Sequence, residues 1–317
     1  MSVNLNTRVS QRQSVDTVKP AQEREPAAKA ETKPAAQERR NQDGMLAPAG
    51  GNKYVAPPRT QEAAPTTGSN PKLDSTNQTA KYQPIPNSQL FAADAGEADA
   101  HLNDVAQGGL GDCYLMAAMG SVAHANPEAV KNAIKGPDKD GNYTVTFHEK
   151  GLFGTKKVDI KVTPDLPVDS SGNPVYAKTH EDGGKKELWP ALIEKAYAQW
   201  NGGYQNIQNR SPADALFALT GKKTETQAAK DVSLSEVNDM LKAGKAVVIS
   251  TLDDGKGKTP YTSKGLVTDH AYVVESVDLK NKTVTLRNPW GEGNAPVVLT
   301  EAEFNQTLEA VMTNPVK

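Results

Sequence analysis

The composition changes sharply along the chain, and this change limits where a folded core can form. The first 80 of the 317 residues contain one aromatic side chain, Tyr54, and no tryptophan, phenylalanine or cysteine. Ten of the 21 prolines lie before residue 87, between polar tracts rich in Gln, Ser, Thr and Ala. Such a segment buries too little apolar surface to offset its ordering entropy. We therefore predict a disordered tail over 1–88 and a folded domain over 89–317.

Charge and hydropathy exclude several kinds of partner. The chain has 36 basic and 38 acidic side chains, so a formal charge of -2 provides no overall field that would attract nucleic acid or an acidic membrane surface. The N-terminus lacks the apolar core of roughly 7–15 residues that marks a secretory signal, and no stretch approaches the ~20 apolar residues of a membrane span. We expect synthesis in the cytoplasm and leave leaderless export open. The role of the tail is also open: an export or targeting signal, an interaction tail, or a propeptide that self-cleavage removes.

Periodicity in the second part predicts helices first and a sheet later. Apolar residues recur at three- and four-residue spacing from Cys113 until Pro127, and again over 187–203, where glycines end the segment. Segments at 246–251, 270–279 and 282–290, with a turn between the last two, predict strands. Upstream, the stretch 140–168 has two alternating segments around a glycine-containing turn, which is typical of a β-hairpin. The expected fold class is therefore α+β, a helical lobe followed by a β-sheet lobe.

The single cysteine lies in the segment QGGLGDCYLMAA, residues 107–118. One thiol cannot form an internal disulfide, so Cys113 is either a small buried hydrophobe or a reactive thiol. We expect Asp112 to cap the helix that begins at Cys113, and the positive end of a helix favours a thiolate there. The glycines before Cys113 allow the backbone to approach a substrate closely.

A cysteine nucleophile needs a base and a group that orients the base, and His270 and Asn288 fit these roles. His270 is the histidine that opens an apolar strand, and the next strand returns after a short turn carrying Asn288. Adjacent strands can place the imidazole beside the carboxamide, whose oxygen fixes the ring tautomer. Gln107 alone would be an ordinary loop residue, but with the others it can donate to an oxyanion together with the Cys113 N–H.

Four sequence blocks in this order resemble the catalytic core of the calpains, the papain-like cysteine endopeptidases. They are the segments 107–113, 188–204, 269–272 and 286–291. The resemblance implies a two-lobed papain-like fold and peptide-bond hydrolysis through a Cys113 thioester acyl-enzyme. It also implies His270 and Asn288 as the other catalytic residues, Gln107 in the oxyanion hole, and Trp290 as a shield of the catalytic hydrogen bonds.

The sequence also departs from the family pattern. Tyr114 replaces the tryptophan usual after the cysteine, Asp269 stands where calpains commonly have glycine, and Asn209-Arg210 replace a glycine pair that lines the cleft. Substrate preference is therefore open, with Gly111, Asp269 and Trp290 as the expected cleft residues.

Metals and cofactors receive no assignment from the sequence. Asp138, Asp140 and Asn142 imitate the start of a calcium loop, but Tyr143 takes the place of the required glycine. We expect no cofactor for the chemistry and assign no metal ligand, while Ca²⁺ is left open as a regulator.

Three functions fit these residues. The first is an endopeptidase acting on protein or peptide substrates, the second an acyl-transfer enzyme such as a glutamine deamidase or transpeptidase, and the third a non-catalytic binding module. The presence of Gln107, Cys113, His270 and Asn288 together favours an enzyme, because a binding module has no need for all four.

Overall fold

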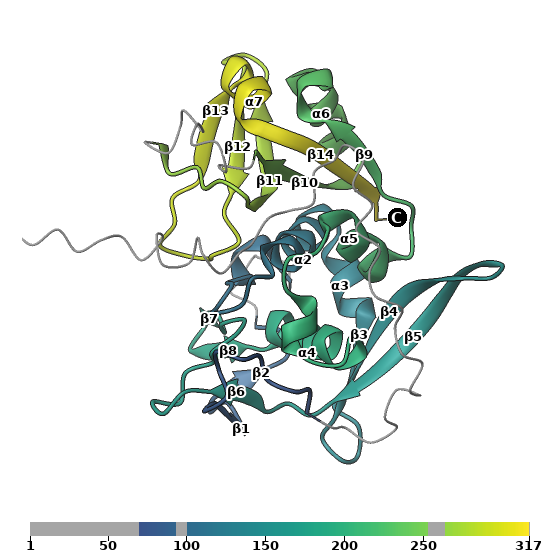
Figure 1. Ribbon diagram of the computed structural model, residues 1–317, viewed down its shortest axis with the longest axis vertical. Helices are drawn as coiled ribbons and strands as arrows, with labels where there is room; N and C mark the ends of the chain where they lie inside the picture. Colours follow the sequence, from purple (N-terminus) through teal and green to yellow (C-terminus); the bar gives the residue numbers. More distant parts are fainter. Residues whose placement is uncertain (1–69, 93–99, 253–263, 317) are drawn as a thin grey trace, which may run out of the picture. The chain divides into compact units, whose positions relative to one another are not determined.

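The structure is a computed structural model that describes residues 70–92, 100–252 and 264–316 (Figure 1). Most of the predicted tail, residues 1–69, lies outside the described residues. The predicted order of elements is confirmed: a helical region comes first, and a six-stranded antiparallel sheet follows it.

Helix α2, Cys113–Ala125, is the centre of the helical region. Every residue from Cys113 to Ala123 is buried, as expected for a segment that is apolar on most of its faces. The helix packs against α3, α5 and the strands β10 and β11 of the large sheet. The other helical segments here are α3 (Pro127–Ala133), α4 (Trp189–Trp200), α5 (Pro212–Thr220) and the 3₁₀ turns η1 (Leu102–Asp104) and η2 (Tyr204–Ile207).

Three small sheets accompany these helices. Strand β1 (Lys81–Gln83) pairs with β6 (Leu166–Val168), and β2 (Ser88–Gln89) joins β8 (Lys185–Glu187) and β7 (Glu181–Asp182). The predicted hairpin is confirmed as β4 (Tyr143–Gly151) and β5 (Gly154–Val162), to which the short β3 (Ile134–Lys135) is added. Its buried side chains alternate along β4, as the period of a strand requires.

The large sheet has the strand order β13-β12-β11-β10-β14-β9. The strands are β9 (Glu225–Ala228), β10 (Lys245–Thr251), β11 (Ala271–Asp278), β12 (Thr283–Arg287), β13 (Val297–Thr300) and β14 (Leu308–Pro315). The remaining segments are η3 (Ala229–Asp231), α6 (Leu234–Lys242) and α7 (Glu301–Thr307).

The two faces of this sheet belong to two different apolar cores. Val248 and Val273 face the core that contains α2, whereas Val247, Tyr272 and their neighbours face the core covered by α6 and α7 (Figure 1). This alternation follows from the two-residue period of strands β10 and β11. Ala271 and Val273, near the start of β11, therefore lie in the same core as helix α2.

The folded chain begins before the predicted boundary at residue 88. Asp74 is buried and accepts a hydrogen bond of 2.8 Å from the Tyr176 hydroxyl, while the Asp74 N–H donates to the same hydroxyl at 2.9 Å. Ile85 is buried and β1 is hydrogen-bonded to β6. Composition missed this segment because polar and main-chain bonds hold it to a core that other residues form.

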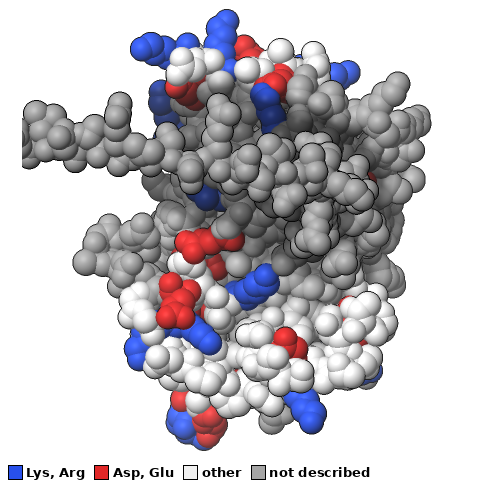
Figure 2. All heavy atoms as spheres, turned by 90° about the vertical axis from the view of Figure 1, so that its left-hand side faces the viewer, with Lys and Arg blue, Asp and Glu red and all other residues white. Residues whose placement is uncertain are grey.

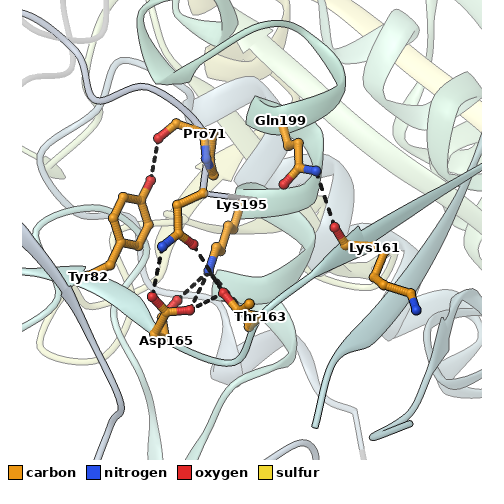
Figure 3. Close-up of polar contacts among 8 residues, drawn as sticks. Pro71, Tyr82, Lys161, Thr163, Asp165, Lys195 and Gln199 are labelled. Atoms are coloured by element: carbon orange, nitrogen blue, oxygen red, sulfur yellow. Dashed lines mark hydrogen bonds and ion pairs between the residues drawn. The ribbon is translucent and has the colours of Figure 1, made fainter. Parts of the chain in front are cut away.

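The buried Lys195 on α4 binds residues 163–165 next to Tyr82 of β1 (Figure 3). Lys195 donates to the Thr163 carbonyl at 3.0 Å and to the Asp165 carbonyl at 2.6 Å, and forms an ion pair with Asp165. Burial lowers the pKa of Lys195 to about 8, although Asp165 opposes that shift. Tyr82 lies beside this group and donates to the Pro71 carbonyl at 2.6 Å.

We predict that Tyr176→Phe lowers the free energy of unfolding by about 1–3 kcal/mol, because it leaves the buried Asp74 N–H and carboxylate without the hydroxyl. Urea unfolding measures the change. Tyr143→Phe is the matched control, since burial is the cause of the pKa shift of that hydroxyl and no hydrogen bond contributes to it. Equal stability of Tyr176→Phe and the wild type would contradict the inclusion of residues 70–88 in the fold.

Candidate active site

Two strand ends bring His270 and Asn288 together. His270 directly precedes β11, Asn288 directly follows β12, and these strands pair with Val273 opposite Arg287. The His270 Nε2 and the Asn288 Oδ1 are 2.9 Å apart. Both residues are buried, so this hydrogen bond lies in a region of low dielectric.

The surroundings of Asn288 determine the tautomer of the imidazole. The main-chain N–H of Trp290 donates to the same Asn288 Oδ1 at 3.1 Å, so the atom at that position is the acceptor oxygen of the amide. The Nε2 of His270 is therefore the donor to Asn288, and Nδ1 is the nitrogen that can take up a proton. The rings of Trp290 and Tyr272 each have their centroid 5.1 Å from that of His270 and enclose it.

The main chain of His270 is fixed by the end of β10. Its N–H donates to Thr251 Oγ1 at 3.0 Å, and the Thr251 N–H donates to the His270 carbonyl at 3.0 Å. Asp269, an expected cleft residue, has a φ of 51°, in the left-handed region where glycine is favoured and Asp is tolerated. This left-handed backbone explains why the position of Asp269 is commonly glycine in the calpains.

Cys113 is the first residue of α2 and is 1% exposed. It belongs to the same apolar core as Ala271 and Val273 of β11, the strand that His270 leads into. The expected capping by the Asp112 side chain is wrong. Asp112 occupies the N-cap position, but its carboxyl makes no capping hydrogen bond and is instead hydrogen-bonded to Glu194.

The loop before Cys113 contacts the loop that carries Asn288. The Gln107 N–H donates to the Pro289 carbonyl at 2.8 Å, and its side-chain Nε2 donates to the Leu110 carbonyl at 2.7 Å. A Cβ on Gly291 would lie 2.5 Å from the Ala106 Cβ, so the two loops touch at a position where a glycine is required. Gln107 is thus held beside the His270–Asn288 pair.

The glycines of this loop allow a close backbone approach to residues 175–177. The Gly109 N–H donates to the Val175 carbonyl at 2.8 Å, and a Cβ on Gly108 would lie 1.7 Å from the Tyr176 carbonyl oxygen. Gly111, another expected cleft residue, accepts a hydrogen bond of 2.8 Å from the Asn209 N–H. Asn209 has a φ of 56°, so this second departure from the glycine pattern also has left-handed backbone.

A buried carboxyl pair supports the same loops, and the sequence analysis missed it. Both oxygens of Glu194 accept from the Ala177 N–H, at 3.1 and 3.0 Å, and Glu194 is hydrogen-bonded to Asp112 next to Cys113. Burial raises the pKa of Glu194 to about 8, so the pair retains a proton at neutral pH. The signal in the sequence was the charged Glu194-Lys195 step inside an apolar helical stretch.

The other four histidines have local structural partners. His101 accepts a capping hydrogen bond from the Asn103 N–H at 3.2 Å. His124 Nε2 lies 2.9 Å from the Glu275 carbonyl, and His148 Nδ1 lies 3.3 Å from the Ala218 carbonyl. His180 Nδ1 is 3.9 Å from a Glu292 carboxylate oxygen. In the part of the chain that the structure describes, none of these four rings is hydrogen-bonded to Asn288.

Within residues 70–92, 100–252 and 264–316, no group of three or more His, Cys, Asp or Glu side chains is suited to hold a metal ion. In the same part of the chain, no helix has the length and apolarity needed to cross a membrane. Acidic and basic side chains are interspersed on the face that Figure 2 presents, in keeping with the nearly balanced charge of the sequence.

Comparison with known proteins shows the family to which the chain belongs. Residues 79–295 match the family described as calpain family cysteine protease. This chain belongs to that family. It is 30% identical over 242 residues to calpain clp-4 of Caenorhabditis elegans, a match that covers 70% of this chain and 33% of the relative.

Two further calpains give similar matches. Calpain-B of Drosophila melanogaster is 31% identical over 201 residues, 59% of this chain and 21% of the relative. The human calpain-1 catalytic subunit is 32% identical over 203 residues, 60% of this chain and 27% of the relative. The chain therefore matches about a fifth to a third of the length of these calpains.

We predict that Glu194→Gln gains stability relative to the wild type as the pH rises from about 5 to about 8. The folded-state pKa of Glu194 is raised from 4.5 to about 8, so wild-type stability is fully present below the lower value and is lost as the pH rises through the upper one. Glutamine keeps a donor and an acceptor but cannot ionise.

Urea unfolding of both proteins across this pH range measures the difference. Lys195 does not interfere, because its lowered pKa of about 8 makes its contribution change only at higher pH. A constant difference between the two proteins from pH 5 to pH 8 would contradict the protonated state assigned to Glu194.

Proposed function

We propose that this chain is a cysteine endopeptidase in which Cys113 is the nucleophile, His270 the general base and Asn288 the residue that orients the imidazole. The observation that carries the proposal is the buried 2.9 Å bond between His270 Nε2 and Asn288 Oδ1. It leaves Nδ1 as the basic nitrogen, on the residue directly before strand β11, which packs against the helix beginning at Cys113. Membership of the calpain family supports the same assignment.

In the proposed first step the Cys113 thiol gives its proton to His270 Nδ1, and Sγ attacks the carbonyl carbon of the scissile peptide. The positive end of α2 favours the thiolate. The carbonyl oxygen becomes negative and accepts from the Cys113 N–H and from a Gln107 side-chain N–H. A carboxamide has two N–H groups, so the bond of Gln107 to the Leu110 carbonyl holds the amide plane while its second N–H serves the oxyanion.

In the second step the tetrahedral intermediate collapses. The C–N bond breaks, and the proton on Nδ1 passes to the leaving amine, which leaves a thioester on Cys113. A water molecule then gives a proton to Nδ1 and attacks the thioester carbonyl, and the acid product leaves as the proton returns to Sγ. The hydrogen bond to Asn288 keeps the ring in one orientation through all these transfers.

The polypeptide environment supports this chemistry. Trp290, 6% exposed, covers the hydrogen bond between His270 and Asn288 and keeps water from competing for it. The glycine-dependent contact of the 106–111 loop with residues 175–177 holds Gln107 in place. We propose that the chemistry needs no cofactor.

We propose a protein or peptide substrate, because a protease domain of this family cleaves such chains. The same Cys113 thioester could also form from a glutamine carboxamide, which would release ammonia. Mass spectrometry of a denatured test protein distinguishes the two: peptide fragments indicate hydrolysis of the backbone, and a change of one mass unit without fragments indicates deamidation.

We predict that Cys113→Ala abolishes hydrolysis of a denatured protein while the melting temperature stays near that of the wild type, because the thiol is lost and the volume hardly changes. An epoxide or chloromethyl-ketone inhibitor should label Cys113 in the wild type. His124→Ala is the matched control, since His124 bonds a main-chain carbonyl away from Asn288 and should keep activity. Retained cleavage by Cys113→Ala would refute the peptidase proposal.

A further inference from the structure

The end of the β4–β5 hairpin places two large apolar side chains in water. Leu152 is 91% exposed and Phe153 is 97% exposed. They form the two-residue loop between Gly151 and Gly154, which pair as the last residues of the two strands. The other exposed large apolar side chains of the described residues are far less exposed: Leu252 at 41%, Leu279 at 45% and Val298 at 46%.

The fold does not require these residues at the loop. The buried side chains of the hairpin lie nearer its other end, at Val145, Phe147 and Ile160, and the loop residues belong to neither apolar core. Two-residue hairpin loops favour Gly, Asn and Asp, not Leu and Phe. Figure 1 shows the loop end of the hairpin extending beyond α4 and α5. Apolar side chains exposed in this way indicate contact with something outside the chain.

Basic side chains surround this apolar loop, which we call the hairpin tip (residues 150–157). Lys150, Lys156 and Lys157 are all exposed. The nearest acidic side chain on the hairpin is Glu149, which lies 3.1 Å from Lys156. The hairpin tip is therefore basic, although the chain as a whole has a formal charge of -2.

We propose that the hairpin tip docks on an anionic lipid bilayer surface, with Leu152 and Phe153 entering the interface and the three lysines at the level of the phosphate headgroups. Lysine stems lie along apolar surface while the ammonium groups stay in the polar layer, and each lysine near an anionic leaflet adds to the attraction. No residue of the tip belongs to the candidate active site, so the inference does not depend on the peptidase chemistry.

The size of the apolar patch favours a bilayer over a protein partner. A stable protein interface buries about 800 Å² on each partner, far more than two side chains at the end of a narrow hairpin provide. A bilayer needs no complementary surface, and partial insertion of a few apolar side chains together with basic residues gives reversible binding. The hairpin tip has this combination: two exposed apolar side chains and three exposed lysines.

Co-sedimentation of the full chain with vesicles tests the proposal. Vesicles of phosphatidylcholine alone are compared with vesicles that also contain phosphatidylserine, at low and at high ionic strength. The wild type should bind the mixed vesicles at low salt, and the double variant Leu152→Ser/Phe153→Ser should bind at least about tenfold more weakly. The matched control Leu279→Ser/Val298→Ser changes two exposed apolar positions, one in the turn after β11 and one on β13, and should bind like the wild type.

Spectroscopy identifies which part of the chain enters the bilayer. In Phe153→Trp the added indole should shift its emission to shorter wavelength on mixed vesicles and not on phosphatidylcholine alone. Lys156→Gln/Lys157→Gln should weaken binding at low salt. Circular dichroism checks that each variant is folded. Absence of wild-type binding at low salt, or equal binding by the wild type and Leu152→Ser/Phe153→Ser, would overturn the proposal.

Discussion

The packing of α2 against the large sheet is the constraint on which the rest of the structure depends. This helix is buried on all sides, because one set of its residues meets α3 and α5 and another meets β10 and β11. Gly120 shows how close the contact is, since a Cβ there would lie 3.0 Å from a methyl group of Val273. A helix held this firmly has a fixed N-terminus, and that N-terminus carries Cys113. Because β11 is one of its contacts, Ala271 and Val273 of that strand belong to the same core as Cys113, and His270 directly precedes them.

The polar groups around the site follow from this burial. A loop that passes between two packed elements must satisfy its backbone groups internally, and here Gln107, Gly109 and Ala106 do so with Pro289, Val175 and Lys178. Glu194 accepts a hydrogen bond from the Ala177 N–H, in the segment that this loop contacts. Its buried carboxyl is kept neutral by a bound proton, and among the described residues no basic side chain compensates its charge. Lys195, the next residue, instead has Thr163 and Asp165 as partners. Two neighbouring titratable side chains on one helix thus contact two different segments.

The sequence was sufficient for the elements with a clear period and insufficient for those that packing decides. The segments at Cys113, at Trp189 and at strands β10 to β12 were found because their apolar spacing matches a helix or a strand. Strand β14 lies between β10 and β9, yet LEAVMTNP has no simple alternation, and its place comes from pairing with β10. Proximity of His270 to Asn288 could be inferred from adjacent strands, whereas the bond of Asp112 to Glu194 joins residues that only the tertiary fold brings together.

The central claim is that Asn288 orients His270 for catalysis and does not merely end a strand. Steady-state kinetics and thermal melting of Asn288→Ala, on one preparation with a denatured protein substrate, test it most directly. Loss of the 2.9 Å bond to His270 Nε2 should lower kcat on the order of ten- to a thousand-fold with a smaller change in KM, while most of the protein stays folded. If the variant loses about 1 kcal/mol of unfolding free energy but turns over at the wild-type rate, Asn288 is only a turn residue and its assignment as the orienting residue is wrong.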